Sequence, residues 1–237
     1  MPEPLLAGVL VTRPQPGAAR TAARLAELGF SPVMAPALTI QTLPAQLPDP
    51  AHIQAVLITS ANALPALPPD YHARPLFAVG TTTALQASQA GFRDVRNADG
   101  DATTLTTMVA HACQPATGKI LLLTGRGQGG ALATALRAQG FRVLRRVVYA
   151  AIPIPDLPAD TSAALAAGRI SHALFFSAET ARAFVRQIHR AKLADCLREI
   201  DAITIGQPAR MALQSVPWRR IRVAERPTQD AMLACLR

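Results

Sequence analysis

The stretch Leu76-Phe-Ala-Val-Gly-Thr-Thr-Thr-Ala-Leu-Gln-Ala-Ser-Gln-Ala-Gly-Phe92 predicts a short buried strand, a glycine turn rich in hydroxyl groups, and then a helix. The same order recurs at Ala202-Ile-Thr-Ile-Gly-Gln-Pro-Ala-Arg-Met-Ala-Leu213. A recurrence of this kind indicates that one α/β unit occurs twice in the chain. We expect the polar turns of two such units to face each other across a cleft.

The opening of the chain also occurs twice. Residues 8–14 predict a strand, a helix follows until Gly29, and residues 30–40 are again extended. Residues 119–126 restart this pattern, and an equivalent glycine-phenylalanine pair follows the second helix. Both copies therefore predict a βαβ unit with parallel strands.

A third strand pattern, at residues 55–60, is repeated at residues 173–177, and Ser60 is placed to cap a short helix. The proline-rich residues 41–52 and 153–158 indicate linkers. Strands that alternate with helices over short loops predict an α/β fold, in which parallel sheets are flanked by helices on both faces.

The composition excludes several classes of protein. The chain has 237 residues, half of them hydrophobic, which is enough for two small cores. No apolar run reaches the roughly 18 residues of a membrane span, and Met1-Pro-Glu-Pro lacks the basic start of a secretory signal. The three cysteines and five histidines are scattered, so no disulfide framework and no metal site is predicted. We expect a cytoplasmic protein without a membrane partner.

The formal net charge of +9 comes almost entirely from arginine, since Lys119 and Lys192 are the only lysines. The guanidinium fork grips carboxylates and phosphates in pairs, which suggests a nucleic acid or a poly-carboxylate small molecule as partner. Compositional drift is an equally weighted alternative, because several arginines fall on helix faces where water is the natural partner.

Ligands of doubly wound folds bind outside the carboxyl ends of the parallel strands. In this sequence those ends are mostly glycine, hydroxyl and arginine residues, in segments 12–13, 59–62, 80–83, 125–127, 177–180, 206–207 and 227–228. Free N–H groups at helix starts attract anions, and glycine allows a close approach. The alternative is that Ser60, Ser177 and Thr228 only cap their helices.

Gly125-Arg-Gly-Gln-Gly-Gly130 fits the dinucleotide pattern G-x-G-x-x-G, because it follows a predicted strand and opens a predicted helix. NAD binding also needs an acidic residue about 20 positions later, where the chain has Arg145 and Arg146, which suit NADP instead. No paired carboxylates, nucleophile elbow or P-loop accompany the pattern. Tyr149, near a predicted linker, either donates a proton or hydrogen bond to a ligand or is a partly buried strand residue.

Taken in order, these segments resemble the uroporphyrinogen-III synthase family. The residues that carry the resemblance span nearly the whole chain: Val9-Leu-Val-Thr-Arg-Pro14, Gly29, Pro36, Ile58-Thr-Ser-Ala-Asn-Ala63, Ala78-Val-Gly-Thr-Thr-Thr-Ala84, Arg126-Gly127, Val148-Tyr149, Phe175-Phe-Ser177, Ile205-Gly206 and Pro227-Thr228.

The resemblance implies two similar α/β domains joined by a two-stranded linker, with the active site in the cleft. One domain is discontinuous and comprises residues 1–38 with 154–237. The second comprises residues 50–146, and residues 39–49 and 147–153 form the linker strands. Members of the family work without a cofactor, and we expect a monomer that binds no nucleic acid.

The implied activity is the cyclisation of hydroxymethylbilane, an open tetrapyrrole with an acetate and a propionate on every ring. Water is lost to give an azafulvene cation, ring D is attacked at its substituted carbon, and the resulting spiro intermediate fragments and recloses with ring D inverted. Because the cation forms readily, the main task of the protein is to position the substrate.

The resemblance also implies a site. Tyr149 would assist departure of the hydroxyl group. The substrate carboxylates would be bound, directly or through backbone N–H groups, by Thr12, Arg13, Ser60, Asn62, Gly80, Thr81, Thr82, Thr83, Arg126, Gly127, Ser177, Gly206, Gln207 and Thr228. Two positions depart from the family pattern. Gln207-Pro208-Ala209 stands where many members have hydroxyl residues, and Ala131 stands where many bacterial members have arginine.

Two alternatives stay open at this point. One is an NADP-dependent oxidoreductase that uses the Gly125 turn, and the other is a two-domain protein that closes on an anion without chemistry. Arg145 and the hydroxyl-rich turns favour the synthase over the first alternative. They do not separate it from the second.

Overall fold

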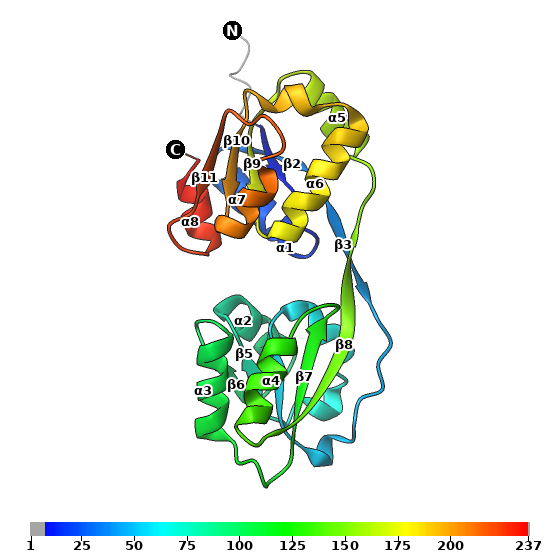
Figure 1. The fold of residues 1–237 in the computed structure, drawn as a ribbon, viewed down its shortest axis with the longest axis vertical. Helices are drawn as coiled ribbons and strands as arrows, with labels where there is room; N and C mark the ends of the chain where they lie inside the picture. Colours follow the sequence, from blue (N-terminus) through cyan, green and yellow to red (C-terminus); the bar gives the residue numbers. More distant parts are fainter. Residues whose placement is uncertain (1–7, 237) are drawn as a thin grey trace. The chain divides into compact units, whose positions relative to one another are not determined.

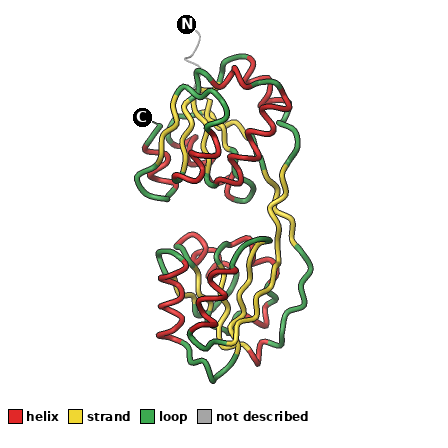
Figure 2. The backbone as a smooth tube through the Cα atoms, viewed as in Figure 1, coloured by secondary structure: helices red, strands yellow, loops and turns green. Residues whose placement is uncertain are grey.

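The computed structural model describes residues 8–236, so the Met1-Pro-Glu-Pro segment lies outside the described part of the chain. The chain divides into two compact units (Figure 1). The first combines Met1–Thr39 with Ile152–Arg237, and the second is Ile40–Ala151. Each contains a sheet with helices on its faces, as the backbone tube in Figure 2 shows, and this confirms the predicted α/β fold class.

The elements of the first unit are β1 (Gly8–Val11), α1 (Gly17–Glu27), β2 (Ser31–Met34), α5 (Ala159–Ala166), β9 (Ile170–Phe175), α6 (Ala178–Ala191), η4 (Ala194–Leu197), β10 (Asp201–Thr204), α7 (Gln207–Leu213), β11 (Arg220–Val223) and α8 (Gln229–Ala234). The strands pair in parallel in the order β11-β10-β9-β1-β2. Helices α1 and α8 cover one face, where Val9, Val11 and Ile203 are buried. Helices α6 and α7 pack together on the other, where Phe184 meets Phe175 edge-on.

The elements of the second unit are β4 (Ile53–Ile58), β5 (Leu76–Ala78), α2 (Thr81–Gln89), β6 (Val95–Asn97), α3 (Ala102–Ala112), β7 (Lys119–Gly125), α4 (Gly130–Ala138) and the 3-10 turns η1 (Pro50–His52), η2 (Ala61–Ala66) and η3 (Pro69–Tyr71). Strands β3 (Leu38–Thr42) and β8 (Arg142–Pro153) complete its sheet, whose order is β3-β8-β7-β4-β5-β6. Because β4 and β7 are interior parallel strands with helices or turns on both faces, they are almost continuously apolar.

Strands β3 and β8 each cross the boundary between the two units. The Leu43 N–H donates to the Val148 carbonyl over 2.8 Å, and the Ile154 N–H donates to the Ala37 carbonyl over 3.0 Å. Residue numbers rise along one strand as they fall along the other, so this pair is antiparallel.

The two sheets share one plan. Without β3, the order of the second sheet is β8-β7-β4-β5-β6, and the first sheet read in the same direction is β2-β1-β9-β10-β11. Every sequence repeat noted above pairs strands that occupy the same place in the two orders, such as β1 with β7 and β9 with β4. In the first unit the chain begins with β1 and β2, which correspond to β7 and β8, and after the second unit it returns to form β9, β10 and β11, which correspond to β4, β5 and β6. The first unit is therefore built from two separate segments.

Proline accounts for two differences from the predicted elements. The extended segment expected at residues 30–40 is split, because β2 ends at Met34 and β3 begins at Leu38, on either side of Pro36. The helix expected after Ser60 is the 3-10 turn η2, which contains Pro65.

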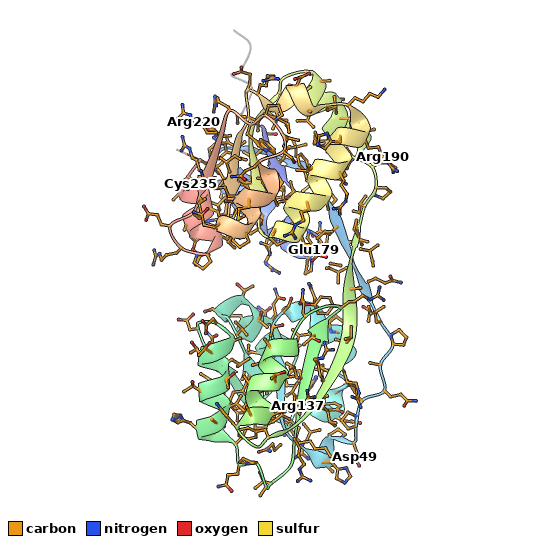
Figure 3. All side chains as sticks on the ribbon, in the orientation of Figure 1. Asp49, Arg137, Glu179, Arg190, Arg220 and Cys235 are labelled. Atoms are coloured by element: carbon orange, nitrogen blue, oxygen red, sulfur yellow. The ribbon has the colours of Figure 1, made fainter. Side chains whose placement is uncertain are left out.

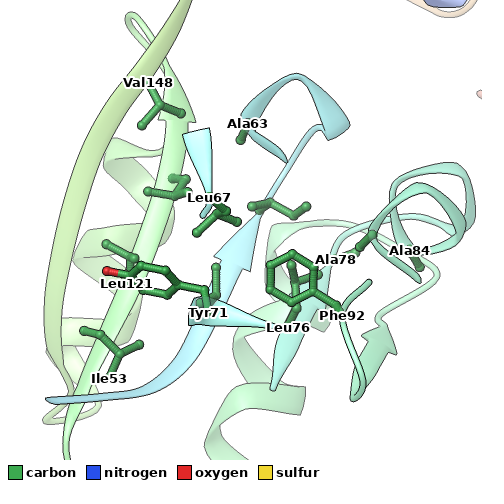
Figure 4. Packing of buried hydrophobic residues seen from close by; sticks show 14 of the residues in the cluster. Ile53, Ala63, Leu67, Tyr71, Leu76, Ala78, Ala84, Phe92, Leu121 and Val148 are labelled. Atoms are coloured by element: carbon green, nitrogen blue, oxygen red, sulfur yellow. The ribbon is translucent and has the colours of Figure 1, made fainter. Parts of the chain in front are cut away.

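One core cluster of the second unit fills the side of the sheet that η2, η3 and α2 cover (Figure 4). Tyr71, Leu76 and Phe92 pack there with Leu121 and Val148. Tyr71 is 1% exposed and its hydroxyl donates to the Pro48 carbonyl, so this phenol is satisfied inside the core.

A buried charge cluster lies at the amino ends of the strands of the first unit, where Figure 3 shows Arg220 at the start of β11. Asp201 is 1% exposed, and its two carboxylate oxygens lie 2.7 Å from Nε of Arg219 and 3.6 Å from Nη2 of Arg222. The hydrogen bond from Arg219, helped by the positive charges, holds the pKa of Asp201 below its usual value. Burial lowers the pKa of the neighbouring His172, although Asp201 opposes this shift.

We expect acid to destabilise the protein through this cluster. Both His172 and Asp201 have depressed pKa values, so the folded state binds fewer protons than the unfolded state and stability decreases as the pH is lowered. The histidine contribution begins to disappear below its unfolded pKa of about 6.5, and the aspartate contribution below about 3.9. Urea unfolding at about pH 7 and about pH 5 gives the loss of unfolding free energy that His172 contributes, and His172→Gln is expected to reduce this loss. Equal losses in the variant and the parent protein would contradict the assignment.

Candidate active site

The first unit has a topological switch point between β1 and β9. The chain passes from β1 to β2 on one side of this boundary, and from β9 to β10 and β11 on the other. Ligands of open α/β sheets bind outside the carboxyl ends of the strands at such a point. Arg13 follows β1 and Ser177 follows β9, so the fold brings these two predicted residues into neighbouring loops.

At this switch point Arg13 is half-buried, and its guanidinium contacts uncharged side chains. Its Cζ lies 4.2 Å from the centre of the Phe176 ring, and its Nη1 lies 3.3 Å from Oε1 of Gln229 and 3.4 Å from Oγ1 of Thr21. Among residues 8–236 no carboxylate forms an ion pair with it. Burial, together with the charge of Arg20, lowers the pKa of Arg13 to about 10, so the side chain is still cationic at neutral pH.

Thr12 follows β1 and lies beside the neighbouring strand β9. The side chain is completely buried, and its hydroxyl donates to the Leu174 carbonyl over 2.6 Å. The hydroxyl is thus used between β1 and β9, and the predicted role of Thr12 in substrate binding stays a prediction.

The capping alternative describes two other predicted residues. Ser177 Oγ accepts the Thr180 N–H over 3.1 Å at the start of α6, and Thr228 Oγ1 accepts the Ala231 N–H over 3.3 Å at the start of α8. Each of these helices also has an acidic residue in its first turn, which is Glu179 in α6 (labelled in Figure 3). These acids interact favourably with the positive ends of the helices and reduce their attraction for a further anion.

At the start of α7 no acid is present. Gly206 is the N-cap with an extended backbone, and Gln207 is exposed as the first helical residue. Pro208 follows and supplies no N–H group, as expected from the sequence.

The switch point of the second unit lies between β4 and β7. Ser60 follows β4, and its Oγ accepts the Asn62 N–H over 3.3 Å. Arg126 and Gly127 follow β7 and are exposed. Arg126 makes no side-chain hydrogen bond or ion pair with any residue that the structure describes, so its guanidinium is available to a ligand.

Tyr149 lies against the turn after β7. It is 3% exposed, and its hydroxyl donates to Oε1 of Gln128 over 3.0 Å. A Cβ placed on Gly125 would lie 2.6 Å from Cε2 and 2.7 Å from Cζ of this ring, so the position of the phenol requires glycine there. Tyr149 is therefore a buried strand residue whose hydroxyl is bonded to the turn after β7, and its role as a donor to a ligand stays a prediction.

The two arginines on which the NADP alternative depends lie on β8 and are hydrogen-bonded within the protein. Arg145 Nη1 donates to the Gln128 carbonyl over 2.7 Å, and Arg146 Nε donates to the Gln46 carbonyl over 3.0 Å. Both guanidinium groups therefore already bind backbone carbonyls, and the first of them braces the turn itself.

The loop at residues 80–83 carries an acidic neighbour that the sequence analysis did not anticipate. The Thr81 hydroxyl donates to Asp99 over 3.0 Å and accepts from Asn97 Nδ2 over 3.0 Å. Thr82 is exposed and Thr83 half-buried, and both belong to the first turn of α2, which has no acid of its own. A ligand at this turn would meet Thr82 and the N–H groups in preference to the Thr81 hydroxyl.

Four residues that contact predicted site residues were missed by sequence reasoning: Phe176, Gln229, Gln128 and Asp99. Only Gln128 had a signal, because it lies inside the glycine-rich pattern that was considered for another ligand. The others act on residues that are 16 or more positions away in sequence, and local patterns do not report such contacts.

Two hollows are lined by residues other than those of the predicted site. One, of about 360 Å³, is lined by Gln54, Phe77, Arg96 and Cys113 in the second unit, and the other, of about 1070 Å³, lies beside β2 and α5 in the first. Neither includes a predicted site residue. Within residues 8–236 no three His, Cys, Asp or Glu side chains are grouped to hold a metal ion, and no helix could span a membrane.

Two units with doubly wound parallel sheets, and with arginine, hydroxyl and glycine residues in the loops at their switch points, define a two-unit protein of the doubly wound α/β class. The sequence profile of the family described as uroporphyrinogen-III synthase HemD matches residues 19–234. The chain therefore belongs to the uroporphyrinogen-III synthase family.

Two solved structures resemble the chain over nearly its full length. The crystal structure of uroporphyrinogen-III synthetase from Helicobacter pylori is 19% identical, with 98% of each chain covered and a TM-score of 0.65. A mutant uroporphyrinogen III synthase from the extremely thermophilic bacterium Thermus thermophilus is 19% identical, with 97% of each chain covered and a TM-score of 0.54. At this identity they establish a shared fold. No curated protein matches the chain in sequence.

Proposed function

We infer that this protein is a uroporphyrinogen-III synthase, an enzyme that cyclises hydroxymethylbilane with inversion of ring D and loss of water. The observation that carries this conclusion is the family match, which extends over residues 19–234 and so includes loops from both units. At one switch point a half-buried arginine has no carboxylate partner in the described part of the chain, and at the other an arginine is exposed; both support a poly-carboxylate substrate.

We propose that the strand-end loops bind the acetate and propionate groups of the substrate. Arg13 and Arg126 supply charge. Backbone N–H groups around Gly80, Gly127 and Gly206 supply neutral donors. The predicted contacts of Ser60, Asn62, Thr82, Thr83, Ser177, Gln207 and Thr228 remain part of this proposal, whereas the hydroxyls of Thr12 and Thr81 are already bonded within the protein. Catalysis then consists mainly of holding the chain of pyrroles in the geometry for inverted closure.

We also propose that residues 1–38 with 154–237 and residues 50–146 act as the two functional domains, linked by residues 39–49 and 147–153. The division of the chain near residues 39 and 152 supports these bounds. We further propose a cytoplasmic monomer, and size-exclusion chromatography with light scattering tests its mass.

The activity is tested with purified protein, freshly prepared hydroxymethylbilane and no added cofactor. We expect the type III isomer of the macrocycle. Formation of the type I isomer alone would reject the assignment. Tight NADPH binding would instead promote the oxidoreductase alternative.

Tyr149 is the proposed donor to the departing hydroxyl group. Its own hydroxyl would exchange the bond to Gln128 for a bond to the substrate. We expect Tyr149→Phe to lower kcat by about tenfold, which is less than the usual 10²–10⁴ of a general acid because the cation forms readily. Steady-state turnover and thermal unfolding are measured together.

Tyr71→Phe is the matched control, since it also removes a buried hydroxyl with one carbonyl partner in the same unit. We expect it to lower stability and leave kcat unchanged. Equal kcat in Tyr149→Phe and the parent enzyme would remove Tyr149 from the chemistry.

A further inference from the structure

Gln229 is the first residue of α8, and it contacts a residue that is 216 positions earlier in the chain. Its Oε1 lies 3.3 Å from Nη1 of Arg13 and 2.8 Å from Oγ1 of Thr21. Thr21 is completely buried in α1, and its hydroxyl also lies 3.1 Å from the Gly17 carbonyl. The amide oxygen of Gln229 thus joins α8, α1 and the loop after β1.

The guanidinium of Arg13 is confined on two further sides. The ring of Phe176 lies 4.2 Å from its Cζ. A Cβ on Gly17 would lie 2.5 Å from its Nε and 2.6 Å from its Cζ, so the α-carbon of Gly17 contacts it closely. Both hydrogen bonds of the guanidinium use Nη1, and among residues 8–236 its Nε and Nη2 have no acceptor. The cation is therefore held in one orientation with its remaining donors free.

The acceptor that holds Arg13 is neutral, and this matters for anion binding. A carboxylate at position 229 would bind the guanidinium more strongly, but it would also cancel the charge that attracts a substrate carboxylate. An amide fixes the same nitrogen and leaves the charge in place. The depressed pKa of Arg13, caused by burial and by the charge of Arg20, agrees with a cation that has no counter-ion within residues 8–236.

We propose that Gln229 is a positioning residue, which orients Arg13 on Phe176 without neutralising it so that Arg13 binds a carboxylate of the substrate. This inference rests on the proposed function. It goes beyond that function in giving a role to a residue that lies outside the predicted contacts and acts only through Arg13.

Two variants test the two parts of this role. Gln229→Glu keeps the shape of the side chain and adds a negative charge, and we expect it to raise KM for hydroxymethylbilane by about tenfold. Gln229→Met removes the acceptor without adding charge, and we expect a smaller rise. In both variants kcat stays within about twofold of the parent value, because the reacting carbons are untouched. Gln214→Glu, which adds the same charge at an exposed site after α7, is expected to leave KM unchanged.

The decisive measurement is a double-mutant cycle with Arg13→Ala. If Gln229 acts through Arg13, Gln229→Glu changes KM by less than about twofold in that background. The same tenfold rise in both backgrounds would overturn the proposal, as would an unchanged KM in both Gln229 variants. Thermal unfolding identifies variants that are merely destabilised, because a general loss of structure would lower the melting temperature and kcat together.

The parent enzyme separates this inference from the function on which it rests. Type I product alone from the parent protein rejects the function and the inference with it. Type III product, with no KM effect at position 229, rejects the inference alone.

Discussion

Replacement of Arg13 by alanine is expected to raise KM for hydroxymethylbilane by about a hundredfold, the largest single effect on substrate binding in this protein. Loss of one partner of a half-buried, hydrogen-bonded charge pair costs about 2–5 kcal/mol. Arg13 is expected to form such a pair with a substrate carboxylate, because it is desolvated, rests on Phe176 and has no carboxylate partner of its own among residues 8–236. The measurement is steady-state kinetics at fixed ionic strength, since salt screens exposed charges.

The folded state is expected to tolerate this change. Arg13 is a cation with no counter-ion among the described residues, so its removal relieves a desolvation cost but also removes packing against Phe176. Arg24→Ala is the matched control, because Arg24 lies on α1 and forms an exposed ion pair with Glu27. We expect the control to leave KM unchanged. A parental KM in Arg13→Ala would show that Arg13 does not meet the substrate.

Replacement of Gly125 by alanine is expected to disturb both stability and turnover. The added methyl group would lie 2.6 Å from the Tyr149 ring, and real Cβ atoms do not approach aromatic carbons so closely. Either the ring or the end of β7 must move, at a cost of about 1–3 kcal/mol. In a chain of this length such a loss lowers the melting temperature by about 2–4 °C per kcal/mol. Movement of the ring also breaks the bond from Tyr149 to Gln128, so kcat falls.

Gly130→Ala is the matched control for this prediction. A Cβ on Gly130 meets no atom within 4 Å, and the residue begins α4, where alanine is favourable. We expect it to leave both the melting temperature and kcat unchanged or slightly improved. Equal behaviour of the two variants would mean that the Tyr149 ring does not depend on Gly125.

Much of the site was predictable in outline. The repeated strand, glycine and helix segments located the carboxyl ends of the strands, and the capping roles of Ser60, Ser177 and Thr228 were anticipated as an alternative. What each side chain does was predictable only where the partner is close in sequence. Asp101, for example, caps α3 by accepting the N–H groups of Thr103 and Thr104.

The amino-acid sequence by itself determined the α/β class, the repeated units and the family resemblance, because helix and strand periods and glycine turns are local signals. Only the tertiary structure decided that Thr12 is buried, that Tyr149 lies on Gly125, and that Arg13 is held by Gln229. These contacts join strands that are neighbours in a sheet, or helices on one face of it, and are distant in sequence. Strand order and packing bring them together, and no local pattern carries that information.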